Sequence, residues 1–112
     1  MSDQITYDHF AKVDIRIGKI VSVEDLSEAR KPIYKLRIDF GSEIGIKNVA
    51  AGIKKFYTKE ELIDRQIIGV VNLAPKNIVN FMSEGMVLAV GDEDGIVLLK
   101  PEKEVELGLR VK

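Results

Sequence analysis

Alternating apolar and polar residues in the first quarter of the chain predict a strand that bends. In residues 13–23, VDIRIGKIVSV, every second residue is apolar as far as Ile17, which is the period of a half-buried strand. Gly18 and Lys19 interrupt this alternation, so we expect a bulge or sharp bend at Gly18. A bent first strand is typical of a small closed barrel.

Two more strands are predicted after a short loop at residues 27–32, SEARKP. Residues 34–41, YKLRIDFG, alternate again, and we expect their apolar members to face inward: Tyr34, Leu36, Ile38 and Phe40. Residues 44–53, IGIKNVAAGI, form a weaker third strand. Its small residues at 50–52 allow the close approach of backbone or ligand.

Helix signals occur at two places. Thr58 is a candidate N-cap, and Glu61 three residues later completes a capping box, which predicts a helix of roughly two turns ending at Arg65. Near the front of the chain, Thr6 is a possible N-cap for a short helix that packs Tyr7 and Phe10.

The apolar runs at residues 66–73, QIIGVVNL, and 86–90, MVLAV, are typical of buried strands, and residues 74–85 between them predict a loop. The element order is therefore three strands, a helix and two strands. This is the order of the oligonucleotide-binding (OB) barrel, whose ligands lie across the middle strands and their flanking loops. We predict an all-β fold: a five-stranded OB-fold barrel with a helix between strands 3 and 4 and with terminal extensions.

Residues 91–112 exceed what a five-stranded barrel needs. We expect a turn at 91–95, a strand at 96–100 and an alternating tail with apolar residues at Val105, Leu107, Leu109 and Val111. Such a tail either covers the barrel bottom or pairs with another subunit, because exposed apolar edges find partners. We expect one domain over residues 1–112, with a barrel core at about 12–90 and a C-terminal extension at 91–112.

Composition excludes several kinds of site. The net charge is −1, from 17 basic and 18 acidic residues, so a nucleic-acid site must be a local patch. Cysteine is absent and His9 is the single histidine, so we expect no metal site and no cofactor.

The chain shows no apolar run of about 18 residues and no basic start followed by an apolar stretch. We therefore expect a cytoplasmic protein with no membrane association.

Catalytic motifs are equally lacking. A single His cannot anchor a convincing Ser-His-acid constellation, and no glycine-rich phosphate-binding loop occurs. The acidic turn at 92–94 is more typical of a solvated surface than of a cation site. We expect no enzymatic activity.

A basic face is the first candidate binding surface. Arg16, Lys35 and Arg37 are predicted to point outward from the first two strands, where they share one surface if those strands pair. Lys19 and Lys47 extend this surface. The alternative is that these are ordinary solvated charges, which the neighbouring Asp14 and Asp39 favour.

The rim loops supply the remaining candidates, above all the polar turn that enters the apolar strand in NFMSEGMVLAV, residues 80–90. Ser83 is the stronger candidate there, whereas Met86 suits a core or mixed position. Phe56 and Tyr57 can stack on bases or pack against the helix, and we prefer packing for at least one of them. Asn72 equally suits a strand-end cap. The other rim candidates are Asn48, Lys54, Lys55 and Lys76.

Four segments together resemble a known family: VDIRIGKIVSVE, NVAAGIKKFYTKEEL, VVNLAPKNI and SEGMVLAV. They are similar to the tRNA-binding domain found at the C-terminus of methionyl-tRNA synthetases, in cytokine-like synthetase cofactors, and in free-standing CsaA-type secretion chaperones. The resemblance runs from about Phe10 onward. The stretch EARKPIYKLRIDFGSEIGIK looks most like the CsaA type, whereas the SEGM loop and AGIKKFYTKEEL look more like the synthetase branch.

This resemblance implies an OB fold with extra terminal elements, two-fold dimerisation, and binding of tRNA by shape. One departure limits it: many members carry a His-Pro-Asp-Ala-Asp-Lys-Leu type loop where this chain reads LSEARKPIYKL at 26–36. We therefore expect a homodimeric tRNA-binding protein. The alternatives are a CsaA-type chaperone for unfolded or secretory polypeptides, and a trans-acting module associated with an aminoacyl-tRNA synthetase.

Overall fold

The computed structural model describes residues 3–112. In chain order its elements are α1 (Tyr7–Ala11), β1 (Ile15–Asp25), β2 (Tyr34–Asp39), α2 (Gly41–Ile44), β3 (Ile46–Ala51), α3 (Lys59–Leu62), β4 (Gln66–Val70), β5 (Lys76–Ile78), β6 (Phe81–Ser83), β7 (Met86–Val87), β8 (Ala89–Asp92) and β9 (Gly95–Leu98).

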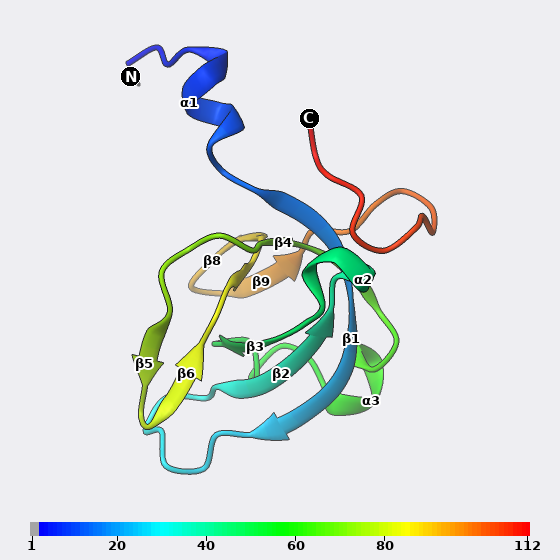
Figure 1. The fold of residues 1–112 in the computed structure, drawn as a ribbon. Coiled ribbons are helices and arrows are strands. Elements are labelled where there is room, and N and C mark those ends of the chain that lie inside the picture. The colour runs from blue at the N-terminus through cyan, green and yellow to red at the C-terminus, as the bar shows by residue number, and fades with distance from the viewer. Residues whose placement is uncertain (1–2) are drawn as a thin grey trace.

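Five antiparallel strands form a nearly closed barrel in the order β3-β2-β1-β4-β7. The long β1 pairs with β2 through its second half and with β4 through its first half, and Figure 1 shows it curving along the side of the barrel. Two small hairpins, β5–β6 and β8–β9, are attached to this sheet. The predicted all-β, OB-type barrel is therefore confirmed.

The barrel core is centred on the inward face of β2. All four apolar residues predicted to face inward are buried there: Tyr34, Leu36, Ile38 and Phe40. The Phe40 ring packs against Gly18 of β1, where an added Cβ would lie 2.7 Å from ring atoms. Because real Cβ contacts are not that short, Gly18 is needed for this close approach.

The expected bulge lies elsewhere. Pairing with β4 is regular across Gly18, and the register with β2 shifts between Ile20 and Ser22. Gly18 interrupts the apolar pattern because it makes room for Phe40, so the inference of a bulge at Gly18 was wrong.

The capping box at Thr58 and Glu61 is confirmed, but the helix ends at Leu62. Asp64 has a φ of 67° and its N–H donates to the Ile20 carbonyl, so the chain is already leaving the helix there.

The predicted loop at 74–85 contains the β5–β6 hairpin, and this prediction was wrong. Ile78 pairs with Phe81 across Val79 and Asn80, both of which have positive φ. A two-residue turn of this kind is usually marked by glycine, which is absent here. Likewise the expected strand at 86–90 divides into β7 and β8, with the Leu88 N–H donating to the Ile68 carbonyl between them.

The C-terminal tail runs beside the first half of β1 in its own chain. The Gly108 N–H donates to the Ile17 carbonyl at 2.8 Å, and the Ile17 N–H donates to the Leu109 carbonyl at 3.0 Å. Val111 makes a similar bond to Ile15 at 2.8 Å. The tail therefore uses the edge of β1 that β2 leaves free, although it forms only an isolated bridge there and no regular strand.

Helix α1 stands apart from the barrel, as Figure 1 shows, on the side where the C-terminus also lies. The Thr6 hydroxyl accepts the His9 N–H, which confirms the predicted N-cap. No residue of α1 is buried, and Tyr7 is 70% exposed. Five-residue helices are not stable in water by themselves. Arg110 of the tail donates to the Ala11 carbonyl at 2.6 Å, but the side chains of α1 are not buried by the described chain.

Candidate nucleic-acid interface

Three outward side chains on the two middle strands form what we call the basic stripe: Lys35 and Arg37 of β2 and Asn48 of β3. Arg37 lies directly opposite Asn48, and Lys35 opposite Ala50, so all of these side chains share the face turned away from the core. Within residues 3–112, neither Lys35 nor Arg37 makes an ion pair. Two carboxylates share this face, Glu24 of β1 directly opposite Lys35 and Asp39 two residues after Arg37, but within residues 3–112 neither pairs with a cation of the stripe.

Arg16 does not join this stripe. Its guanidinium is bonded to Asp14 at 2.6 Å, to Glu43 at 3.0 Å and to the Gly108 carbonyl at 3.0 Å. The hydrogen bond to Asp14, with the further bond to Glu43, raises the pKa of Arg16. Its backbone pairs with β4 and not with β2. Its guanidinium holds the C-terminal tail through the Gly108 carbonyl, and its other donors are already bonded to Asp14 and Glu43.

Lys19 and Lys47, which were expected to extend the basic face, do not lie within the basic stripe. Lys19 lies at its margin, and Lys47 lies on the opposite face of the sheet. Lys19 sits opposite Asp39, with its ammonium 3.7 Å from Asp64. Lys47 lies opposite the buried Ile38, which places it on the other face of β3 from Asn48 because successive residues of a strand alternate.

An apolar groove of about 430 Å³ lies between β3, the segment after β4 and the β5–β6 hairpin. Met86 lines this groove and is 47% exposed. Met86 is therefore a surface residue and does not belong to the core. Lys76 is the one cation among its lining residues. The full lining, which defines the apolar groove, is Ala50, Leu73, Ala74, Lys76, Ile78, Ser83, Gly85 and Met86.

Ser83 and Glu84 close the barrel through their side chains. The Ala50 N–H donates to Ser83 Oγ at 3.0 Å, and the Ser83 hydroxyl donates to the Gly85 carbonyl at 3.3 Å. Glu84 is bonded twice to Asn48: its N–H donates to the Asn48 carbonyl, and its carboxylate accepts the Asn48 N–H, both at 2.7 Å. Ser83 is buried at 8% exposure, so its hydroxyl holds the wall of the groove.

Asn72 has a structural partner at each end of its amide. Its nitrogen donates to the Lys12 carbonyl at 2.7 Å, and its oxygen accepts the Asp14 N–H at 2.9 Å. The amide therefore ties the segment between α1 and β1 to the end of β4, in keeping with the cap alternative.

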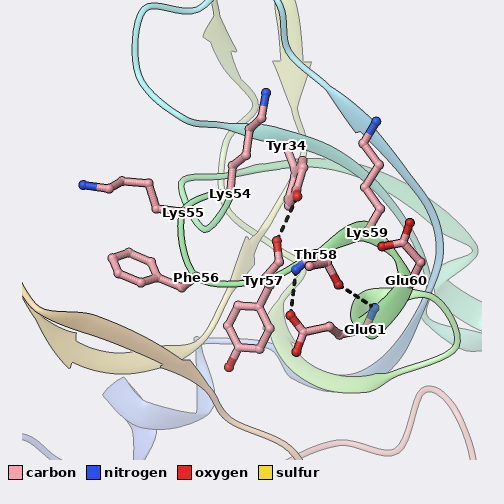
Figure 2. Close-up of a pocket in the computed structure, with 9 residues that line it drawn as sticks. All are labelled: Tyr34, Lys54, Lys55, Phe56, Tyr57, Thr58, Lys59, Glu60 and Glu61. Atoms are coloured by element: carbon pink, nitrogen blue, oxygen red, sulfur yellow. Dashed lines mark hydrogen bonds between the residues drawn. The ribbon is translucent and has the colours of Figure 1, made fainter.

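Lys54, Lys55, Phe56 and Tyr57 lie at the approach to α3, around the pocket in Figure 2. Tyr57 packs against the core, and its hydroxyl accepts the Leu98 N–H at 3.0 Å, which fits the packing role expected for one of the two aromatics. Figure 2 shows the Lys55 side chain extending away from Lys54.

Asp25, at the end of β1, is held by two lysines. Its carboxylate lies 3.1 Å from the Lys54 ammonium and 3.2 Å from that of Lys59. Hydrogen bonds from Lys54 and then Lys59 hold the pKa of Asp25 below its ordinary value. Lys54 is thus partly neutralised, whereas Lys55 makes no ion pair in the described chain.

Asp25→Asn is expected to destabilise the fold at neutral pH, with a difference that shrinks in acid. Because the folded-state pKa is lowered, the stabilisation is present above the ordinary carboxyl value of 3.8 and is lost as pH falls through the folded value. Urea unfolding midpoints of both proteins at pH 7 and at decreasing pH below 4 measure this. The matched control, Glu102→Gln, removes an exposed carboxylate without an ion pair in residues 3–112. A difference that stays constant with pH would contradict the assignment.

A second groove, of about 510 Å³, lies between the β1–β2 loop and the tip of the β5–β6 hairpin and was not expected from the sequence. We call it the loop groove; its lining includes Ala29, Arg30, Lys31, Ile33, Ile78 and Val79. The basic pair Arg30–Lys31 beside an apolar Ile33 was a visible signal, but the hairpin that completes the groove was not anticipated.

Within the described residues 3–112, no group of three His, Cys, Asp or Glu side chains is arranged to hold a metal ion. No helix of that part of the chain is both long and apolar enough to span a membrane.

Comparison with known proteins places these features in a family. The family described as "Putative tRNA binding domain" matches residues 15–110. The methionine–tRNA ligase of Pyrococcus furiosus is 44% identical over 108 residues, which are 96% of this chain and 14% of the ligase. The chain thus spans about one seventh of the length of that relative.

Two solved structures cover this chain almost completely. The CsaA chaperone protein of Picrophilus torridus is 50% identical with a TM-score of 0.90, and the match covers 97% of this chain and 100% of the chaperone. A protein of Pyrococcus horikoshii described as related to MetRS is 31% identical with a TM-score of 0.87, over 99% and 100% of the two chains.

Proposed function

This chain belongs to the tRNA-binding domain family, and on that basis we propose that it binds tRNA as a homodimer, through the basic stripe and the loops around it. The observation that carries this proposal is the position of Lys35 and Arg37. Both are free of ion pairs within the described chain and point outward from β2, on the face where OB barrels hold oligonucleotides.

The proposed contacts are a subset of the sequence-based candidates. Lys35, Arg37, Lys55 and Lys76 supply charge for phosphates, and Asn48 supplies an amide within the stripe. Arg16, Asn72 and Ser83 are left out because their polar atoms already have partners inside the protein. Phosphate contacts of this kind position a folded RNA by its shape and carry no base information by themselves.

Helix α1 supports the homodimer. Ile5 is 67% exposed and Tyr7 70% exposed. Leu109 of the tail is also exposed, and the C-terminal end of the tail lies on the same side of the molecule as α1 (Figure 1). A second copy that packs on these residues would bury them and cover the exposed side chains of α1. The dimer would also double the basic stripe, so that one tRNA touches both subunits and gains avidity without new contacts.

Filter-binding titration of tRNA at several salt concentrations tests the proposal. Each neutralised phosphate contributes a slope of about −0.7 to −0.9 to a plot of log K against log salt. Four cations from one subunit should therefore give a slope of about −3, and two subunits together about −6. An unstructured RNA of equal length is the control and should bind more weakly. Absence of tRNA binding at low salt would overturn the proposed function.

A second candidate function, binding of unfolded polypeptides, is favoured by the apolar groove and by the likeness to CsaA chaperone proteins. Leu73, Ile78 and Met86 offer a groove that suits apolar side chains. Binding of this kind should persist at salt concentrations that remove tRNA, because it depends on apolar burial. Binding of an unfolded polypeptide in high salt, without tRNA binding in low salt, would favour this candidate.

A further inference from the structure

The loop groove has walls fixed by backbone hydrogen bonds. On one side, the buried Leu26 donates its N–H to the Ile33 carbonyl at 3.1 Å, and the Ala29 N–H donates to the Leu26 carbonyl at 3.0 Å. On the other side stands the tip of the β5–β6 hairpin, which lies next to the β1–β2 loop in Figure 1. Both sides of the groove are therefore held by hydrogen bonds within the chain itself.

The hairpin tip carries an unfavourable residue at the groove. Val79 has a φ of 48° and Asn80 a φ of 66°, as the two central residues of a tight hairpin turn. Asn tolerates this left-handed conformation, whereas a β-branched residue such as Val is strained there. Val79 lines the loop groove and is exposed. Backbone strain of this kind clusters at ligand sites, where the side chain does something that a relaxed residue would not.

The chemistry of the lining indicates what would occupy this groove. Ala29, Ile33, Ile78 and Val79 provide apolar walls, and Arg30 and Lys31 provide two cations beside them. Glu28 is the single acid of the lining, and its carboxylate accepts the Ser27 hydroxyl at 3.3 Å. The apolar walls suit a flat group with apolar faces, and the two cations suit a phosphate attached to it. An unstacked nucleotide offers both, a base for the walls and a phosphate for the cations.

We propose that the loop groove accepts an unpaired nucleobase of the bound RNA, with Val79 as one wall and Arg30 and Lys31 on the adjoining phosphates. This inference rests on the proposed tRNA-binding function and adds a determinant to it. The basic stripe recognises the shape of paired RNA, whereas the loop groove selects RNA with an accessible single-stranded end or loop. The pair of cations distinguishes this groove from the apolar groove, whose lining holds only Lys76.

Val79→Asn separates the proposed role from a structural one, because stability and binding should move in opposite directions. Asn suits a positive φ, so the unfolding midpoint should stay the same or rise. The affinity for tRNA should fall about tenfold, because the apolar contact between the base and Val79 is lost. The affinity for a blunt RNA duplex, which offers no unpaired base, should not change. Val79→Gly, which also relieves the strain, should behave in the same way.

Val97→Asn is the matched control, since Val97 is an exposed hairpin valine outside both grooves. If wild type binds tRNA and Val79→Asn binds it equally well, the base site is wrong while the proposed function stands. If Val79→Asn weakens tRNA and duplex by the same factor, the base site is also wrong. If wild type binds neither RNA, the proposed function fails first, and the base site fails with it.

A polypeptide occupant is the remaining outcome. Reduced, carboxymethylated α-lactalbumin, which stays unfolded, is the probe for it. Loss of binding to this polypeptide in Val79→Asn, with tRNA affinity unchanged, would overturn the base site in favour of a polypeptide groove.

Discussion

Replacing Lys35 and Arg37 together by Glu is expected to abolish tRNA binding while leaving the barrel folded. Both side chains point away from the core and lack ion pairs in the described chain, so the substitution removes two phosphate contacts and places two repelling charges in their position. In a dimer the effect occurs twice. The remaining affinity should fall below detection at physiological salt, because salt has already weakened the contacts that are left. Filter binding and circular dichroism measure binding and folding.

The control is Lys100→Glu combined with Lys103→Glu, which changes the net charge equally outside the basic stripe and both grooves. This variant should keep most of the wild-type affinity. If the two double variants lose affinity equally, the protein's overall charge governs binding and the basic stripe is not its site. Arg16 is left unchanged on purpose, because its partners Asp14, Glu43 and Gly108 make it a structural residue.

Replacing Ile5 and Tyr7 by Glu is expected to convert the dimer into a folded monomer. These side chains are exposed and α1 contains no buried residue, so the change should cost little within one subunit, but it places charges in the apolar contact of the proposed dimer. Light scattering should fall to the mass of one chain, 12.5 kDa. The apparent affinity for tRNA should fall by a factor of about 10² or more, because avidity is lost.

Truncation after Lys100 provides a comparison. The tail holds hydrogen bonds to Ile15 and Ile17, so its removal is expected to give a monomer or an unfolded chain. A well-folded dimer after truncation would show that the tail lies outside the interface. A wild-type protein that is already monomeric in solution would overturn the dimer proposal.

The fold was largely predictable because its strands alternate. Tyr34, Leu36, Ile38 and Phe40 differ from their polar neighbours so regularly that the buried face of β2 follows directly. The capping box at Thr58 and Glu61 is equally local. Gly18 was misinterpreted because a glycine that makes room for a distant ring and a glycine that allows a bulge leave the same interruption in a sequence.

The candidate site was less predictable because it depends on pairing between distant segments. Arg16 and Arg37 have the same pattern in the sequence, and only the return of the tail past β1 shows that Arg16 is occupied. Asn72 and Ser83 are likewise committed by partners 60 and 33 residues away. The β5–β6 hairpin escaped prediction because Val79 and Asn80 turn without glycine, and with it the loop groove was missed.

The closure of the barrel at Ser83 and Glu84 has an evolutionary consequence. Two side chains and one backbone hydrogen bond carry the connection between β3 and the turn before β7, whereas the paired strands of the barrel are joined by ladders of backbone hydrogen bonds that every sequence can make. Substitutions at these two positions can therefore shift one wall of the apolar groove while the core around Phe40 stays the same. Related chains with one common barrel could in this way diverge in the ligands they accept.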